Sequence, residues 1–213
     1  MPVMRLSYLL YLALFLSFTT QVNAYEANGF EITPLVGYRF GGDFEVTEGD
    51  VSINPPTKIS LSEEINYGLL FAWDYDRKRQ GEFLINHYNS QFSQTIDPIA
   101  TNNNIAVTYA HIGGNVPISD GYLPAYITAG LGLTHLSPED SLLDDETRFS
   151  MNVGIAIKIP VSEHLSFRFG GRVYATFFNS DSKIFCNEEN CAISISSDLW
   201  IQSEVNAGIT FTF

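Results

Sequence analysis

Stretches in which apolar and polar residues alternate recur along most of this chain of 213 residues. Within residues 147–160, for example, Phe149 and Met151 alternate with Arg148 and Ser150. Such a period of two places successive side chains on opposite faces of a β-strand, whereas a helix returns to the same face about every 3.6 residues. The pattern therefore predicts an all-β protein whose strands have one apolar face and one polar face.

Eight segments of this kind follow one another, separated by turns and loops. One segment of about ten alternating residues is weak evidence for a transmembrane strand, but eight in succession are typical of a membrane barrel. Alternation is poor in the third and fourth segments, where we expect strands without assigning their faces. The sequence predicts a transmembrane eight-stranded antiparallel up-and-down β-barrel. The expected strands are residues 29–42, 60–75, 81–95, 103–116, 122–136, 147–160, 164–178 and 196–213.

The charged face of these strands should line the interior of the barrel. A charge on the lipid-facing side near the middle of the bilayer costs about 2–4 kcal/mol. Opposite charges that meet inside would form a hydrogen-bonded network, with Arg168 and Arg172 expected beside Glu204 on the neighbouring strand. Glu82 and Asp74 are further candidates for the inner face. The candidates for this ion-pair network are Glu31, Arg39, Glu64, Arg148, Lys158, Arg168, Arg172 and Glu204.

A soluble up-and-down barrel with an apolar interior would show the same alternation. In that case the polar face would meet water, and we would expect many Lys and Glu residues on it. The polar face here is instead rich in Gly, Ser, Thr and Asn, and its charges are of both signs. This composition favours the membrane barrel.

The first 24 residues have the organisation of a secretory signal peptide. A basic start at Arg5 precedes an apolar stretch, residues 6–18, and a polar tail that ends at Val22-Asn23-Ala24. Small residues at the third and first positions before a cut fit cleavage after Ala24. The apolar stretch is shorter than the roughly 20 residues of a membrane-spanning helix. We therefore expect export, removal of residues 1–24, and a single barrel domain of residues 25–213.

The mature chain is strongly acidic. The whole sequence has 11 Lys and Arg and 24 Asp and Glu. Arg5 is the one charged residue of the signal, which leaves 10 basic against 24 acidic residues. This balance argues against nucleic acid as a partner, because phosphates need basic side chains. The acids of the loops suit divalent cations but lack the regular spacing of a calcium-binding loop, so we expect no metal and no cofactor.

The connections between the expected strands alternate in length, which orients the barrel. Short turns of such barrels lie on the periplasmic side and long loops on the outside. The sequence therefore predicts four outer loops and periplasmic termini. The expected turns are residues 76–80, 119–121 and 162–164, and the expected loops are 43–59, 96–102, 137–146 and 179–195.

The opening strand 30–42, the closing strand 206–213 and the signal resemble those of one family over the whole mature chain. The family is that of small eight-stranded outer-membrane barrels, which includes the barrel domain of outer-membrane protein A and the opacity-like proteins. The resemblance implies a place in the outer membrane of a Gram-negative bacterium, in contact with lipid and lipopolysaccharide. It also implies that the barrel-assembly machinery recognises the alternating apolar residues at the C-terminus. These assembly-signal residues are Ile209, Phe211 and Phe213.

Cys186 and Cys191 are the two cysteines of the chain. An even, closely spaced pair in an exported protein predicts a disulfide. The bond would close a ring of six residues in the last outer loop and contribute about 2 kcal/mol by the chain-entropy estimate.

One short motif raises the possibility of catalysis. His135 and Ser137 lie two residues apart on an expected strand, so they face the same way, as a base and a nucleophile must. Glu139 and Asp140 follow, but Pro138 intervenes, and the surrounding residues do not match the lipid A deacylases known among small barrels. A lipid A acyl enzyme is therefore a remote alternative, and we expect no enzyme.

The width of the barrel bears on its function. Eight strands enclose a space just wide enough for side chains to fill, whereas open aqueous pores belong to barrels of about 16 strands. We therefore expect a plugged, non-enzymatic barrel that acts in envelope integrity or in surface interaction, with an extracellular ligand or a host surface as the partner of its loops. The alternative is a narrow small-solute channel or ligand-binding barrel.

Overall fold

The computed structural model describes most of the expected barrel domain. The predicted signal peptide, residues 1–24, lies outside the described residues. Within the part of the chain that the structure describes, no helix is long and apolar enough to cross a membrane. The described residues are 29–42, 44–46, 57–76, 78–93, 103–119, 123–139, 144–178, 183–186, 191–194 and 199–213.

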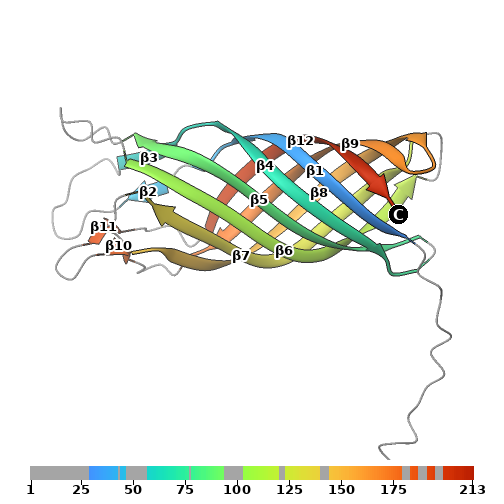
Figure 1. The fold of residues 1–213 in the computed structure, drawn as a ribbon. Helices are drawn as coiled ribbons and strands as arrows, with labels where there is room; N and C mark the ends of the chain where they lie inside the picture. The colour runs from blue at the N-terminus through green and yellow to red at the C-terminus, as the bar shows by residue number, and fades with distance from the viewer. Residues whose placement is uncertain are drawn as a thin grey trace, which may run out of the picture.

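Eight long strands form a closed ring in which each strand is antiparallel to both neighbours, as the sequence predicts. Figure 1 shows these strands wound at a tilt around one axis. Neighbours in the ring follow one another along the chain, and the last strand pairs with the first. Closure leaves no strand edge facing lipid. The strands are β1 (Phe30–Phe40), β4 (Glu64–Asp74), β5 (Gln80–Ser93), β6 (Asn103–Ser119), β7 (Ala125–Pro138), β8 (Glu146–Ser162), β9 (Leu165–Phe177) and β12 (Leu199–Thr212).

Two segments that we expected to be loops contain short hairpins. β2 (Phe44–Val46) pairs with β3 (Thr57–Leu61), which also joins β5 through Ser60 and Ser93. β10 (Lys183–Cys186) and β11 (Cys191–Ser194) pair with each other in a separate two-stranded sheet.

The two ends of the barrel differ. At one end, which we call the turn end, lie the C-terminus and the tight connections from β4 to β5 and from β8 to β9. At the opposite end, the loop end, lie the hairpins β2–β3 and β10–β11 (Figure 1). Because the short turns of such barrels lie on the periplasmic side, we expect the turn end to face the periplasm and the loop end to face outward.

The facing that alternation predicts for the first, second and last three segments is confirmed. On β1, Thr33 and Arg39 are buried inside the ring, whereas Val36 and Tyr38 are exposed on the outer wall. β4, β8, β9 and β12 show the same division, with apolar side chains outside. In an aqueous protein such a wall would be costly, but in lipid it is the expected surface.

The loop-end halves of β5 and β6 reverse this division, which explains why their sequences alternate poorly. Here apolar side chains such as Tyr88 and Val107 point into the barrel and are buried. Polar side chains point outward instead. His87 on β5 and Thr108 on β6 share a hydrogen bond of 2.9 Å on the outer wall, and Asn89 is exposed beyond them. In this part of the wall, polar side chains therefore do not all face the interior of the barrel.

The wall is also taller on this side. β6 and β8 have 17 residues each and β5 and β7 have 14, whereas β1 and β4 have 11. A tilted transmembrane strand needs about 9–11 residues to cross the hydrocarbon. The strands from β5 to β8, and β12 with 14 residues, are therefore longer than the hydrocarbon requires.

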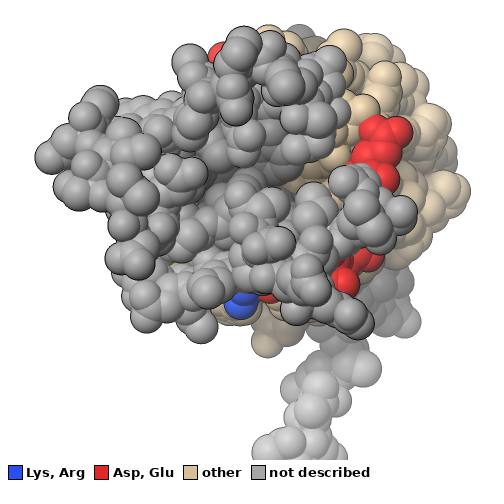
Figure 2. Space-filling model, turned by 90° about the vertical axis from the view of Figure 1, so that its left-hand side faces the viewer, with Lys and Arg blue, Asp and Glu red and all other residues tan. Residues whose placement is uncertain are grey.

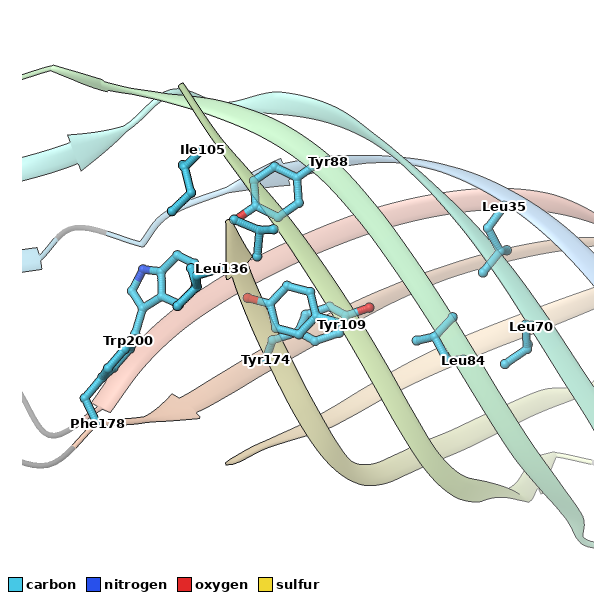
Figure 3. Close-up of a cluster of buried hydrophobic side chains, with 11 residues drawn as sticks. Leu35, Leu70, Leu84, Tyr88, Ile105, Tyr109, Leu136, Tyr174, Phe178 and Trp200 are labelled. Atoms are coloured by element: carbon cyan, nitrogen blue, oxygen red, sulfur yellow. The ribbon is translucent and has the colours of Figure 1, made fainter. Parts of the chain in front are cut away.

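Side chains fill the interior in two apolar groups. The larger group lies toward the loop end and includes Tyr88, Tyr109, Tyr174 and Trp200 (Figure 3). A smaller group of leucines, Leu35, Leu70 and Leu84, lies toward the turn end (Figure 3). Charged and amide side chains meet alongside and between these groups.

Candidate functional site in the barrel interior

One buried ion pair joins the first and last strands of the ring. Arg39 on β1 lies opposite Glu204 on β12 in the ladder, and its Nη2 is 2.5 Å from Glu204 Oε2. Both side chains are 1% exposed. Asn86 on β5 accepts a hydrogen bond from the same Arg39 nitrogen at 2.8 Å and donates one to Glu204 at 3.2 Å. The three side chains thus form a closed triangle between β1, β5 and β12.

Three tyrosine rings surround the Arg39 guanidinium. Its central carbon lies 5.0 Å from the ring centroid of Tyr88, 4.6 Å from that of Tyr109 and 4.2 Å from that of Tyr174. The hydroxyl groups of Tyr88 and Tyr109 both donate to Gln202 Oε1, at 2.7 and 2.6 Å. Cations on aromatic faces are attracted most strongly where water is excluded. Side chains from β1, β5, β6, β9 and β12 therefore meet in one layer across the lumen, which we call the tyrosine layer.

A second layer lies around Glu82 of β5. Its carboxylate accepts hydrogen bonds from Arg168 at 3.1 Å and from Arg172 at 3.0 Å, both on β9. Asn115 on β6 donates to the same carboxylate at 2.8 Å, and Arg172 also donates to Asn152 at 2.8 Å. β5 and β9 are four strands apart in either direction around the ring, so these contacts span its full diameter. We call this set the Glu82 layer.

A third contact crosses the lumen near the turn end. Lys158 on β8 lies 2.6 Å from the Glu31 carboxylate of β1 and donates a hydrogen bond to Gln80 of β5 at 3.0 Å. Its ammonium group also lies 5.0 Å from the ring centroid of Tyr126. The contact joins three strands that are not neighbours in the ring.

The remaining two candidates of the predicted network lie at the loop end. Arg148 lies 2.7 Å from Glu146 on its own strand, and its guanidinium is 5.8 Å from the ring of Phe178. Glu64 accepts a hydrogen bond from Ser62 at 3.0 Å. Neither group takes part in the layers described above.

Two partnerships differ from our expectation. We expected Arg168 and Arg172 beside Glu204, but Glu204 pairs with Arg39, and both arginines reach across the lumen to Glu82. Arg172 does lie opposite Glu204 in the β9–β12 ladder, but its long side chain extends away from the wall. The inner position expected for Glu82 is confirmed, but its pairing with both arginines was not predicted.

Comparison with known proteins agrees with this architecture. The model of one family, the outer membrane protein beta-barrel domain, matches residues 10–213. The chain belongs to this family. The bacterial outer membrane is therefore its location, and lipid surrounds its apolar wall. No curated protein matches the sequence.

Solved structures resemble this outer-membrane barrel in fold. The outer membrane protein OprG from Pseudomonas aeruginosa is 12% identical with a TM-score of 0.61, over 88% of this chain and 96% of that one. Neisserial surface protein A is 10% identical with a TM-score of 0.55, over 86% and 97%. The outer membrane protein AlkL is 11% identical with a TM-score of 0.55, over 89% and 92%. Identities this low show the shared fold alone.

The geometry at His135 and Ser137 differs from that of a nucleophile and its base. Both side chains face outward at the loop end, on the same face of β7 as we expected. Ser137 donates to Asp145 at 2.6 Å, and His135 Nε2 lies 3.7 Å from the same carboxylate. His135 Nδ1 bonds to Thr147 at 2.9 Å. A serine nucleophile is activated by a hydrogen bond to its base, but here Ser137 donates its hydrogen bond to the Asp145 carboxylate.

Acidic side chains are exposed at the rim of the loop end, some of them visible in red in Figure 2. No group of three or more His, Cys, Asp or Glu residues with metal-binding geometry occurs in the described part of the chain. The acids of the first outer loop, residues 43–59, lie outside the described side chains. The exposed acids with described side chains include Glu63, Glu139, Asp144 and Asp145.

Cys186 and Cys191 are register partners at the closed end of the β10–β11 hairpin. Directly opposed residues of an antiparallel pair have Cα atoms about 4.5–5.5 Å apart, which is within the range that a disulfide spans. The side chains themselves lie outside those described, so the disulfide stays a prediction.

The residues of the expected assembly signal all lie on the outer wall at the turn end. Ile209, Phe211 and Phe213 are exposed to the lipid region. The backbone NH of Phe213 donates to the carbonyl of Phe30 at 2.9 Å, and the two rings lie 6.4 Å apart. The C-terminus is thus fixed beside the start of β1, where the ring closes.

Proposed function

We propose that this outer-membrane barrel is a closed, non-enzymatic scaffold that acts in envelope integrity or surface interaction through its four outer loops. The observation that supports this proposal is the pair of cross-lumen layers. The tyrosine layer and the Glu82 layer join opposite sides of the ring with buried side chains. A rigid, filled barrel suits a protein whose variable loops carry the recognition.

Energetics support a stable plug rather than a readily opened gate. Opening the Glu82 layer would separate one carboxylate from two guanidinium groups, each at most 6% exposed. Breaking a buried ion pair costs about 3–5 kcal/mol because the remaining charge loses its partner. The binding free energy of a solute with ordinary affinity for the lumen would not offset this cost at both layers.

Partners follow from the same proposal. Lipopolysaccharide and lipid would surround the wall, the barrel-assembly machinery would recognise the C-terminal strand, and an extracellular ligand or host surface would meet the loops. The exposed acids at the loop end favour contacts that are bridged by divalent cations over direct contacts with phosphate. Loop-shortened variants of residues 137–146 should keep the barrel folded and lose cell-surface binding.

Planar-bilayer recording tests the closed lumen. The wild-type protein should show no defined conductance steps, and Arg39→Ala, which removes the centre of the tyrosine layer, should show small ones. Glu163→Gln, in an exposed turn outside the lumen, is the matched control and should remain silent. Folding of each variant is checked by its different migration on detergent gels before and after boiling. Wild-type steps that Glu204→Ala or Arg168→Ala abolishes would instead establish the narrow channel.

A further inference from the structure

An apolar groove of about 610 Å³ crosses the lipid-facing wall near the turn end. Its floor is a row of register partners on neighbouring strands, Gly81 on β5, Gly114 on β6 and Ala129 on β7. Trp73 on β4 continues the row on one side. The groove therefore crosses four strands at the level where β4 ends.

The groove is open where Gly114 lacks a side chain and Ala129 has only a methyl group, whereas Gly81 is covered by Trp73. The indole of Trp73 lies flat over Gly81, where an added Cβ would be 2.2 Å from the ring. Ile112 and Val116 stand on either side of Gly114 and are 61% and 50% exposed. Their Cα atoms are about 13 Å apart at 3.3 Å per strand residue. Two apolar ridges thus bound one channel on the surface.

One basic side chain lines this groove at its periplasmic end, and a second basic residue lies in the same turn. Arg79 lines it, 5.5 Å from the ring of Tyr75, and is paired with Asp76 at 2.5 Å. Lys78 is its exposed neighbour in the same turn. The other basic residues with described side chains lie elsewhere. Arg39, Lys158, Arg168 and Arg172 are inside the lumen, and Arg148 lies at the loop end.

We propose that the groove holds an acyl chain of an anionic phospholipid of the periplasmic leaflet, with its phosphate beside Lys78 and Arg79. Tyr75 and Trp73 lie at the level of the headgroups, where amphipathic rings are favoured. This site is additional to the scaffold role and does not depend on a closed lumen.

The headgroup of the lipid, rather than its acyl chain, determines the selectivity of the groove. Lipid tails are as apolar as the wall, so the groove supplies shape and packing but no hydrophobic driving force. Each basic residue near an anionic membrane surface favours the anionic lipid about fivefold. Asp76 offsets part of the charge of Arg79, so we consider Lys78 and Arg79 together as the headgroup site. A second copy of the chain is a poorer occupant, because a two-fold pair would bring two basic turns together.

The chain contains its own reporter of occupancy. Its two tryptophans are Trp73, which lines the groove, and Trp200, which is buried in the lumen. Trp200→Phe leaves Trp73 as the sole indole. This variant is reconstituted in phosphatidylcholine vesicles with increasing fractions of either dibrominated phosphatidylglycerol or dibrominated phosphatidylcholine, whose bromines quench tryptophan on contact. Phosphatidylglycerol should reach half-maximal quenching at about a fivefold lower fraction.

Two sets of substitutions distinguish a specific lipid site from ordinary lipid contact. Lys78→Gln with Arg79→Gln should abolish the preference, and Ala129→Phe should fill the groove and reduce quenching by phosphatidylglycerol. Glu163→Gln and Ala207→Phe, at another turn and on another part of the outer wall, should leave the preference intact. Equal quenching by both lipids, or a preference that survives loss of both basic residues, overturns the proposal. So does dissociation of a cross-linkable dimer by Ala129→Phe, which would identify a second copy as the occupant.

Discussion

Glu82 on β5 binds Arg168 and Arg172 of β9 at once, at 3.1 and 3.0 Å, across the full diameter of the barrel. A single carboxylate therefore balances two guanidinium groups that lie four residues apart on one strand. The arrangement ties together strands that share no backbone hydrogen bond. Each of its members depends on the other two, because a buried charge without a partner is costly.

Glu82→Gln should destabilise the barrel strongly. The change removes the negative charge, keeps the size of the side chain, and leaves two buried arginines unbalanced. We expect a loss of about 3–5 kcal/mol in the free energy of unfolding, measured by urea titration of the folded protein in vesicles. Glu163→Gln, in an exposed turn, should change it by less than about 0.5 kcal/mol. Equal stabilities of the two variants would contradict the assignment of Glu82 as the centre of its layer.

The pair Arg39 and Glu204 should be strongly coupled. Arg39→Met or Glu204→Met alone leaves one buried charge, and each should cost about 3–5 kcal/mol. The double variant removes both charges and should cost clearly less than the sum of the two, because apolar side chains replace a buried pair at little net loss. Unfolding of all four proteins under one condition gives the coupling energy. Strict additivity would show that the two groups act independently.

The first periplasmic turn should lose its stabilising contacts in acid. The pKa of Asp76 is lowered to about 2, first by the hydrogen bond from the Arg79 side chain and then by the backbone NH groups of Lys78 and Arg79. An unfolded Asp titrates near about 3.9. The contribution is therefore complete above pH 4 and is lost as the pH falls toward 2. The difference in stability between wild type and Asp76→Asn should shrink over that range and stay constant at higher pH.

Oxidation of Cys186 and Cys191 should change the loop and leave the barrel unchanged. Their hairpin forms a separate two-stranded sheet and adds no strand to the barrel. Mass spectrometry after alkylation should find both thiols blocked in protein from the periplasmic route and free after reduction. The roughly 2 kcal/mol of the ring stabilises the separate hairpin alone, so the urea midpoint of the barrel should be the same in both forms, while protease cleavage within the hairpin should become faster on reduction. Free thiols in the exported protein would rule out the bond.

The sequence predicts the strands well because the membrane imposes one rule on the outer wall. Where that rule applies without exception, as along β8 with Met151 outside and Asn152 inside, facing follows directly from alternation. It fails near His87, where His87 and Thr108 satisfy each other by a hydrogen bond on the outer wall.

The partners inside the lumen are harder to predict. Alternation places Arg172 on the inner face, but its partner depends on how far a long side chain reaches across the closed ring. Partners on adjacent strands can be predicted from the sequence, whereas partners four strands away around the ring cannot. The interpretation of His135 and Ser137 shows the same limit. Their shared face follows from spacing, whereas the position of Asp145 between them depends on the connection to β8.

The unequal height of the wall sets how far the protein stands out from the cell. Strands of 14 and 17 residues from β5 to β8, against 11 in β1 and β4, leave a surplus of about 3 to 6 residues, which the two ends of the barrel share. At 3.3 Å per residue, this surplus is roughly 10 Å or more of strand, and its share at the loop end raises the connection between β7 and β8. That connection would then start above the lipid surface, whereas β1 and β4 end closer to it. Large molecules approaching the cell would therefore meet one side of the rim first.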